Sequence, residues 1–242
     1  MSCKVMGIVN VTPDSFSDGG RYYRPEEAVR RAWNLAADGA DIIDLGGEST
    51  RPGATPIGWE EEWDRIKPVL SELRRKSVEL RVSVDTYHPE TAKRAIEAGV
   101  DIINCVDAGS VPEMARLLEG NGVELVVPAS AVDTRHRALV SRLYLDPMIG
   151  FGTTREEDVV RLRSIPELAK RGRVLVGASR KRIVKKLTGE KMTGKNLGGN
   201  VGIAVWAAMK GASVVRVHDV RETVQALRVV EALGAENEDT GN

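Results

Sequence analysis

Polar and charged side chains stand at the carboxyl ends of the short apolar segments of this sequence. They carry carboxylate, amide, hydroxyl, basic and imidazole groups, at Asn10, Asp44, Asp85, Asn104, Asp146, Ser179, Arg180, Lys181, Arg216 and His218. A single carboxylate at such a place can simply cap the helix that follows. Many polar ends at once favour a shared binding or catalytic crevice, because the parallel strands of a barrel end on the same side.

Three of these residues form a set of hydrogen-bond acceptors. Asp85 and Asp146 offer carboxylates, and Asn104 offers an amide. Such a set suits a flat heterocycle whose amino group and ring N–H donate side by side. Lys181 would add a donor for a carbonyl oxygen or a ring nitrogen of the same ligand. These residue types therefore predict a pocket for a polar heterocycle.

A second set has the opposite character. It consists of neutral and cationic donors that follow the first, second and last apolar segments: Asn10, Arg51, Arg216 and His218. In a closed barrel the last and first strands are neighbours, and their ends form a frequent phosphate site. The amino end of a helix that begins near Asp219 would strengthen the attraction for anions. We therefore expect an anionic, phosphorylated small-molecule substrate.

Two long loops would close over these sets. The segment NVTPDSFSDGGRYY follows the first apolar segment and is rich in Pro, Gly, Ser and Asp, which is typical of a mobile lid, with an ordered surface loop as the alternative. The segment GGESTRPGATPIG follows the second apolar segment. It could meet the first loop over the barrel mouth, and its Arg51 has no obvious helix partner.

The elements that must position these residues alternate along the chain. Eight short apolar segments predict strands: KVMGIVN, ADIIDLGG, LRVSVD, VDIIN, VELVVPAS, RLYLDP, RVLVGASR and ASVVRVHD. Stretches of helical period lie between most of them, as at 25–38, 59–75, 89–97 and 220–233. The apolar runs are continuous, which is typical of parallel strands buried on both faces. Eight such units predict a single-domain α/β fold, the (β/α)8 TIM barrel, with a doubly wound open sheet as the alternative.

The fifth unit departs from this pattern. Only about a dozen residues, 130–142, separate the fifth strand from the sixth, near the minimum for a parallel crossover. This spacing predicts a shortened fifth βα unit with a very short helix. A second subunit or another loop would then have to cover that part of the barrel wall, and a homodimer is one way to do so.

The composition limits the classes of partner. Hydrophobic residues make up 42% of the chain and charged residues 29%, enough for one large core, so we expect a barrel domain over 1–235 and a polar tail over 236–242. Thirty-five basic residues balance thirty-five acidic ones, which argues against binding to nucleic acid or to an anionic membrane. Two cysteines outside any metal-ligand spacing, and no signal segment or long apolar run, predict a cytoplasmic protein.

Seven segments resemble the dihydropteroate synthase family: GIVNVTPDSFSDGG, DIIDLGGESTRPGA, SVDT, IIN, LDPMIGFG, VGASRK and VVRVHDV. The resemblance spans nearly the whole chain, and its long irregular loops are specific. It implies a transferase of folate biosynthesis, in which the amine of p-aminobenzoate captures the methylene carbon of a dihydropterin methyl diphosphate. Pyrophosphate would leave with the help of Mg²⁺, and dihydropteroate would be the product.

The resemblance also implies roles for individual residues. The positions that match the family's pterin pocket are Asp85, Asn104, Asp146 and Lys181. Asn10 matches the asparagine associated with magnesium, and Thr50 matches a contact on the pyrophosphate side. Arg216 and His218 match the basic pair that holds the pyrophosphate. The expected catalytic residues are therefore Lys181, Asp146, Arg216 and His218. No protein nucleophile is needed, since magnesium and cations would stabilise the departing group.

The second substrate, p-aminobenzoate, would lie among the loops. By resemblance, Phe16 would help to enclose its ring together with Arg51 and Pro52. The family's small serine after the SRK segment is Arg182 here, which could replace a contact or point away.

Other departures from the family pattern cluster around the fourth to seventh strands. Cys105 follows Asn104 where aspartate is usual, and Asp107 two places on could take over the acidic role. The segment VVPASAV replaces a Met-His-Met sequence, and Met148 and Thr153 stand where glycine and lysine are usual. Two alternatives to a compact synthase therefore stay open: a pterin-binding paralogue without synthase activity, and a pterin-dependent methyltransferase.

Overall fold

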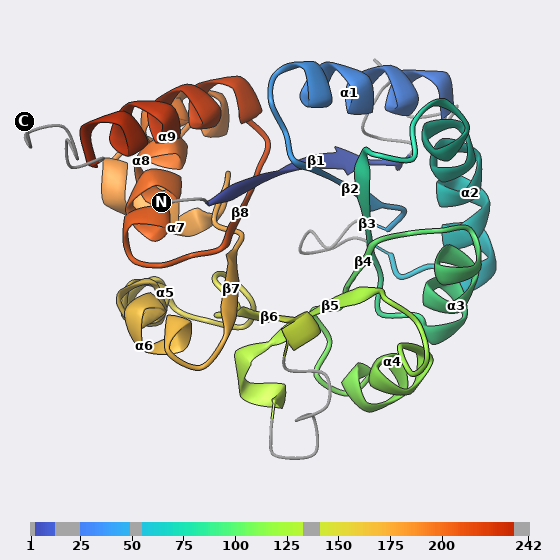
Figure 1. The fold of residues 1–242 in the computed structure, drawn as a ribbon. Helices are drawn as coiled ribbons and strands as arrows, with labels where there is room; N and C mark the ends of the chain where they lie inside the picture. Colours follow the sequence, from blue (N-terminus) through green and yellow to red (C-terminus); the bar gives the residue numbers. More distant parts are fainter. Residues whose placement is uncertain (1–2, 13–24, 49–54, 133–140, 235–242) are drawn as a thin grey trace, which may run out of the picture.

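The computed structural model describes residues 3–12, 25–48, 55–132 and 141–234, which form a closed barrel of parallel strands in the order β1 to β8. The strands are Lys4–Asn10 (β1), Ile42–Gly46 (β2), Arg81–Asp85 (β3), Ile102–Asn104 (β4), Glu124–Pro128 (β5), Leu143–Asp146 (β6), Arg173–Val176 (β7) and Val214–Val217 (β8). Figure 1 looks down this ring. The predicted TIM barrel is confirmed, and the open sheet is wrong because β1 pairs with β8.

Helices surround the ring. They are Pro25–Ala37 (α1), Trp59–Lys76 (α2), Pro89–Glu97 (α3), Val111–Leu117 (α4), Arg155–Arg163 (α5), Ile165–Ala169 (α6), Arg182–Thr188 (α7), Leu197–Met209 (α8) and Val220–Gly234 (α9). The four helices expected from periodicity correspond to α1, α2, α3 and α9, each end lying within one residue of its expected place. No described helix is long and apolar enough to cross a membrane.

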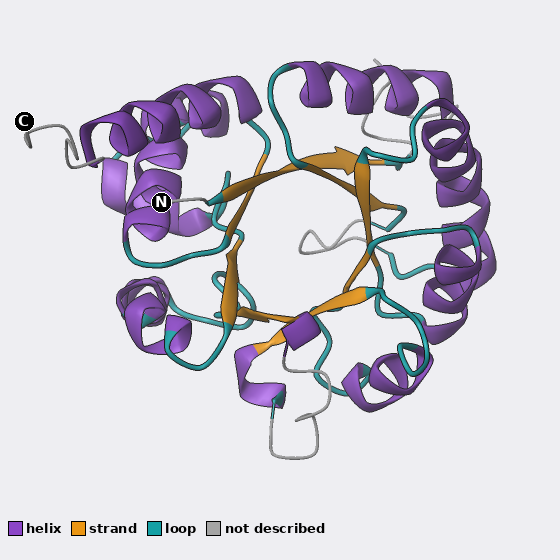
Figure 2. Cartoon of the chain, in the orientation of Figure 1, coloured by secondary structure: helices purple, strands orange, loops and turns teal. Residues whose placement is uncertain are grey.

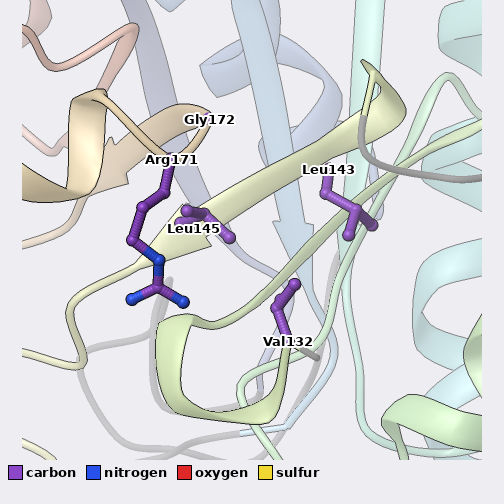
Figure 3. Close-up of a pocket in the computed structure, with 5 residues that line it drawn as sticks. All are labelled: Val132, Leu143, Leu145, Arg171 and Gly172. Carbon is purple, nitrogen blue, oxygen red and sulfur yellow. The ribbon is translucent and has the colours of Figure 1, made fainter. Parts of the chain in front are cut away.

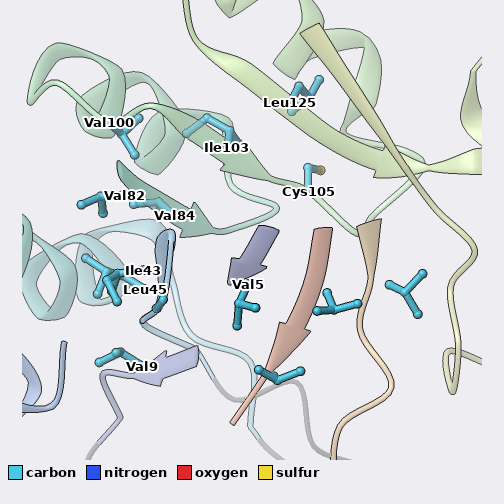
Figure 4. Close-up of a cluster of buried hydrophobic side chains, with 14 of the residues drawn as sticks. Val5, Val9, Ile43, Leu45, Val82, Val84, Val100, Ile103, Cys105 and Leu125 are labelled. Carbon is cyan, nitrogen blue, oxygen red and sulfur yellow. The ribbon is translucent and has the colours of Figure 1, made fainter. Parts of the chain in front are cut away.

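Side chains along each strand alternate between the helix layer and the barrel interior. Outward-facing residues such as Val5, Ile43 and Val82 pack into one large cluster with the helices (Figure 4). Inward-facing residues form a separate apolar layer: Met6, Ile42, Ile102, Val126, Tyr144, Leu175 and Val214. Two residues further along four of these strands come polar side chains, those of Asp44, Asn104, Asp146 and Arg216. Because side chains two residues apart face the same side of a strand, the apolar layer is followed by polar side chains at the carboxyl end of the barrel interior.

The amino end of the barrel is closed by a charged cluster. Glu124 lies between Arg81 and Arg173 and forms an ion pair with each. The Tyr144 hydroxyl donates to Glu124 Oε2 at 3.3 Å, and the Arg173 guanidinium lies 4.0 Å from the centre of the Tyr144 ring. Burial opposes ionisation of Glu124, but hydrogen bonds from Arg173 and Arg81 lower its pKa below the usual value. This end is filled by the protein's own side chains.

The fifth unit is shortened, as expected, but the described part of its connection holds no α-helix. A turn of 3-10 helix, η2 (Ala129–Ala131), follows β5 (Figure 2), residues 133–140 lie outside the described residues, and Ser141 and Arg142 have a 3-10 conformation directly before β6. Arg171 reaches across from the turn before β7 and donates from Nη2 to the Ala129 carbonyl at 3.4 Å. A cavity of about 40 Å³ remains (Figure 3), lined by Val132, Leu143, Leu145, Arg171 and Gly172.

The outer face of β6 is buried. Leu143 and Leu145, which a fifth helix would otherwise cover, are each 3% exposed. Arg171, a loop residue, therefore helps to cover the part of the barrel wall for which the sequence predicted a loop or a second subunit. The proposed tail, 236–242, lies outside the described residues, so that domain boundary stays a prediction.

Candidate active site at the carboxyl ends of the strands

Strand register places three of the predicted site residues in one row. Asn10 lies opposite Gly46, and Gly46 lies opposite Asp85. Asp85 in turn lies opposite Asn104. A Cβ atom built on Gly46 would lie 3.8 Å from Asp85 Cβ and 4.0 Å from Asn10 Oδ1. The missing side chain of Gly46 therefore leaves room between the amide of Asn10 and the carboxylate of Asp85.

Arg216 reaches two carboxylates from β8. Its Nε donates to Asp44 Oδ2 and its Nη2 donates to Asp85 Oδ2, both at 2.6 Å. Burial opposes the charge of Arg216, but Asp44 and Asp85 raise its pKa above the usual value. Burial in turn raises the pKa of Asp85 to about 7, against the lowering effect of Arg216. The acidic and basic sets, which look separate in the sequence, are joined through this arginine.

Asp146 ends β6 at the same mouth of the barrel. Its side chain is buried, and its Oδ1 accepts a hydrogen bond from the backbone N–H of Met148 at 2.6 Å. Burial raises the pKa of Asp146, whereas Lys181, the Met148 N–H and Arg216 act in the opposite direction. Since no described residue donates to Oδ2, this oxygen is available as an acceptor for a ligand.

Lys181 immediately precedes α7 and packs over the loop that follows β6. Its Nζ donates to the Ile149 carbonyl at 2.6 Å and lies 4.2 Å from the centre of the Phe151 ring. A Cβ atom on Gly150, whose φ is +78°, would come within 3.0 Å of Lys181 Cδ, so this path of the lysine depends on glycine. Burial lowers the pKa of Lys181 to about 8, and Asp146 and Asp85 oppose that shift. Both carboxylates therefore act on this ammonium group.

His218 follows β8 and is oriented by a serine. Its Nδ1 lies 3.0 Å from the Ser179 hydroxyl, and its backbone N–H donates to the same hydroxyl at 3.3 Å. The His218 carbonyl accepts from Arg31 of α1 at 3.0 Å. The structure thus fixes both the backbone and the ring of His218, and Ser179 becomes the residue that positions it.

Two buried acceptors at this mouth have no partner among the described residues, namely Asp44 Oδ1 and Asn104 Oδ1. The amide of Asn104 points its donor elsewhere, from Nδ2 to Asp44 Oδ2 at 3.4 Å. A buried acceptor without a donor costs free energy, so a ligand that brings donors to this place is favoured. This is the chemistry of a flat, donor-bearing ring.

Asn10 is the residue predicted to associate with magnesium, and its surroundings fit that ion. The half-buried amide lies beside the room left at Gly46. Within the part of the chain that the structure describes, no group of three or more His, Cys, Asp and Glu side chains could hold a metal ion alone. Mg²⁺ commonly takes one or two protein oxygens and completes its shell with water and substrate phosphates. Asn10 could therefore contribute one oxygen ligand, and the magnesium site stays a prediction.

Four predicted site residues, Phe16, Thr50, Arg51 and Pro52, lie outside the described residues. The second loop can be followed as far as Glu48, whose two carboxylate oxygens each lie 3.1 Å from the Tyr87 hydroxyl. His88 Nε2 lies 3.6 Å from the same carboxylate. Residues of the β3–α3 connection therefore anchor the start of the second loop.

The structure also places the residues that depart from the family pattern. Asp107 is exposed, and its Oδ2 accepts from the backbone N–H and the hydroxyl of Ser110, both at 2.8 Å. Its carboxylate thus stabilises the turn before α4. Arg182 is exposed on α7, which favours the alternative that it points away from the site. Burial raises the pKa of the Cys105 thiol to about 12, so this cysteine is unreactive.

Sequence reasoning gave no role to three charged residues near this mouth. Asp44 is recognisable as a strand-end carboxylate, but its ion pair with Arg216 spans 172 positions of sequence. Asp158 and Arg161 lie on α5, and only the fold shows that they contact the loop after β6. No local pattern signals either contact.

Comparison with known proteins gives consistent matches over the whole barrel. Residues 6–140 and 138–218 match the family described as pterin binding enzyme. A dihydropteroate synthase of Neisseria meningitidis serogroup C is 38% identical, and the alignment covers 96% of this chain and 93% of that protein. The dihydropteroate synthase type-3 of Escherichia coli is 35% identical, with 96% and 99% covered.

Solved structures that superpose on this chain belong to the same family. The Xanthomonas albilineans dihydropteroate synthase with 4-aminobenzoic acid superposes with a TM-score of 0.86 at 39% identity, covering 97% of this chain and 94% of that one. The dihydropteroate synthase of Anaplasma phagocytophilum with bound 6-hydroxymethylpterin-monophosphate gives a TM-score of 0.86 at 30% identity, covering 96% and 100%.

Proposed function

The chain belongs to the dihydropteroate synthases, transferases of folate biosynthesis among the pterin-binding enzymes, and we propose how its own residues serve that reaction. The reaction condenses (7,8-dihydropterin-6-yl)methyl diphosphate with p-aminobenzoate to give dihydropteroate and pyrophosphate. The observation that carries the proposal is the excess of buried acceptors at the barrel mouth, where Asp44 and Asn104 each keep an unpartnered oxygen among the described residues. A pterin ring presents neighbouring donors of the kind these oxygens lack.

Three acceptors and one cation would bind the pterin. Asp85, Asn104 and Asp146 accept from its amino and ring N–H groups, and Asp146 Oδ2 is the acceptor that no described residue uses. Lys181 donates to the carbonyl oxygen or a ring nitrogen, in place of its present bond to the Ile149 carbonyl. Binding orients the ring so that its methylene carbon faces the incoming amine.

The diphosphate would lie on the side of β8 and β1. Arg216 uses Nε and Nη2 for the two aspartates, which leaves Nη1 to donate to a phosphate oxygen. His218 would add a second donor. When bound, Mg²⁺ would be held by Asn10 and would neutralise charge on the departing pyrophosphate. The C–O bond breaks and its electron pair leaves with pyrophosphate, the amine nitrogen bonds to the methylene carbon, and that nitrogen releases one proton to water. The protein's task is therefore orientation and charge placement.

The assembly belongs to the same proposal. Helix α8 is apolar in most of its residues, yet Leu197 and Met209 are 43% and 54% exposed, and Leu187 of α7 and Met192 between α7 and α8 are also exposed. A second copy of the chain would cover such side chains, so we propose a homodimer. The free thiols of Cys3 and Cys105 would stay reduced in the cytoplasm, where we propose that the protein acts.

A single assay tests the proposed function. Purified protein is mixed with Mg²⁺, the pterin diphosphate and p-aminobenzoate, and dihydropteroate and pyrophosphate are measured. Equal amounts of both products, lost when Mg²⁺ is chelated, are expected. Tight pterin binding with no product would overturn synthase activity in favour of a pterin-binding paralogue. Methyl transfer from a methylated pterin to a corrinoid protein would instead support the methyltransferase. Sedimentation velocity measures the oligomeric state.

A further inference from the structure

The loop between β6 and α5 contains an unusual backbone conformation. Three of its residues have a positive φ: Met148 at +61°, Gly150 at +78° and Gly152 at +62°. Glycine adopts this left-handed region freely, but a residue with a Cβ atom is disfavoured there. Met148 must therefore be held in place by its surroundings.

The surrounding contacts come from α5, which packs against α7 on the outside of the barrel (Figure 1). Arg161 Nη1 donates to the Met148 carbonyl at 2.6 Å and to the Pro147 carbonyl at 3.2 Å. One turn earlier, Asp158 Oδ1 accepts from the Gly150 N–H at 2.7 Å and from the Thr153 hydroxyl at 2.6 Å. Helix α5 therefore forms hydrogen bonds with both the first and the second half of the β6–α5 loop.

The backbone N–H of Met148 points towards the site, on the other side from its carbonyl group. While the Met148 carbonyl is bound to Arg161, its N–H donates to Asp146 Oδ1 at 2.6 Å. One residue thus connects a charged helix residue to a carboxylate of the site. Burial raises the pKa of Asp146, and Lys181, the N–H of Met148, Arg216 and, to the smallest extent, Arg161 lower it.

We propose that Arg161 is a positioning residue for pterin binding, which acts through the left-handed Met148 to hold Asp146 with one oxygen bound to the Met148 N–H and the other presented to the ligand. The inference rests on the proposed function for the identity of the ligand. Arg161 touches no substrate atom in this scheme. Its contribution is to fix a backbone that glycine would adopt without help.

A double-mutant cycle tests this role, because the scheme predicts that glycine at position 148 makes Arg161 dispensable. The variants are Arg161→Met, Met148→Gly and the two combined, with Arg163→Met as the matched control, since Arg163 is exposed at the end of the same helix. Affinity for 6-hydroxymethylpterin monophosphate is measured by calorimetry from pH 5 to pH 8, together with KM for p-aminobenzoate.

We expect Arg161→Met to weaken pterin binding about tenfold, the loss typical of one disturbed charge-assisted contact, with KM for p-aminobenzoate little changed. In the Met148→Gly background the same substitution should cost less than about threefold. The acid limb of pterin binding should move to higher pH in Arg161→Met, because a cation that favours the ionised carboxylate is lost. Arg163→Met should behave as the wild type does.

Two outcomes would overturn the inference. Wild-type pterin affinity in Arg161→Met would show that Arg161 positions nothing. An equal loss in both backgrounds, without a shift of the acid limb, would show that Arg161 acts only on general stability. If the wild-type protein itself binds no pterin, the proposed function fails and this inference fails with it, which is a distinct result.

Discussion

The two ends of the barrel interior both bury ions, but in opposite proportions. At the amino end one carboxylate, that of Glu124, lies between the guanidinium groups of Arg81 and Arg173. At the carboxyl end one guanidinium, that of Arg216, lies between Asp44 and Asp85. The inward-facing apolar layer separates the two clusters. The same strands thus carry an excess of cation at one end and an excess of anion at the other.

The groups left without partners differ in the same sense. At the amino end they are donors, Nε and Nη2 of Arg173. The carbon of that guanidinium lies 4.0 Å from the centre of the Tyr144 ring, which itself attracts a cation. At the carboxyl end they are acceptors, Asp44 Oδ1 and Asn104 Oδ1, without a comparable contact among the described residues. The protein's own side chains therefore complete the amino end, whereas the carboxyl end keeps acceptors that a ligand with donors would satisfy.

The largest effect is expected from breaking the amino end. Glu124→Met leaves two arginines without their shared carboxylate and should lower the free energy of unfolding by about 3 kcal/mol. This is the low end of the usual range, since the arginine side chains are 29% and 33% exposed. Urea denaturation measures the loss, and kcat/KM should stay within about threefold. Glu113→Met, at an exposed position of α4, is the control. A variant that keeps its stability but loses activity would reverse the assignment of the two ends.

A substitution at the carboxyl end should weaken ligand binding and leave stability nearly unchanged. Asp146→Asn replaces a buried acceptor and should weaken pterin binding by about 1–3 kcal/mol, roughly tenfold to a hundredfold, while stability changes little. Calorimetry with a pterin measures the affinity. Asp107→Asn removes a carboxylate that caps an exposed turn and should leave pterin affinity intact. Unchanged affinity in Asp146→Asn would mean that the pocket is misplaced.

The two ends should also respond to pH in opposite directions. Burial raises the pKa of Asp85 to about 7, so its contribution to stability is full below about pH 4 and is lost as the pH rises towards 7. The pKa of Glu124 is lowered by its arginines, so its contribution is present above about pH 4.5 and is lost as the pH falls. Urea midpoints between about pH 2 and about pH 8 measure both trends.

The Asp85→Asn variant separates the two contributions. It should lose less stability than the wild type between about pH 5 and pH 7, by up to about 1.4 kcal/mol per pH unit. Parallel curves for the two proteins would show that Asp85 titrates normally, and the contrast between the ends would then rest on geometry alone.

The smallest effect is expected between the two ends. Ser83 is inward-facing on β3, and its buried hydroxyl has no partner in the described part of the chain. Ser83→Ala removes this unsatisfied group and should raise the free energy of unfolding by about 1 kcal/mol. Thermal denaturation measures the gain. A loss of stability would show that the hydroxyl is bonded, and that the layer between the ends is not dry.

The barrel could be predicted from sequence because its signals are local. Each strand is a short apolar run, and four of them, β1, β3, β4 and β6, end in a polar residue. The register then places Asp85 and Asn104 side by side. The helices follow equally local rules, since α1 buries Ala28, Val29, Ala32 and Leu35 at helical spacing. The sequence alone therefore identifies Asn10, Asp85 and Asn104 as residues of the site.

The contacts themselves could not be predicted, because they depend on side chains that meet across the fold. The pairing of Arg216 with Asp44 and Asp85 joins the last strand to the second and third, and Arg161 is an ordinary charged residue until α5 is placed beside the loop after β6. The expected short helix in the fifth unit is a 3-10 turn in its described part, since few residues are available for a helical crossover.

Arg216 also limits which acceptor oxygens a ligand can use at the barrel mouth. Its guanidinium already occupies one oxygen of Asp44 and one of Asp85. A molecule that displaced the guanidinium from either oxygen would gain only the difference between the two interactions, whereas a donor to a remaining oxygen, such as Asp44 Oδ1, displaces nothing. Compounds that bring no donor gain nothing by displacing the arginine. Arg216 therefore favours ligands whose donors fit the oxygens that it leaves unoccupied, which favours selectivity over affinity.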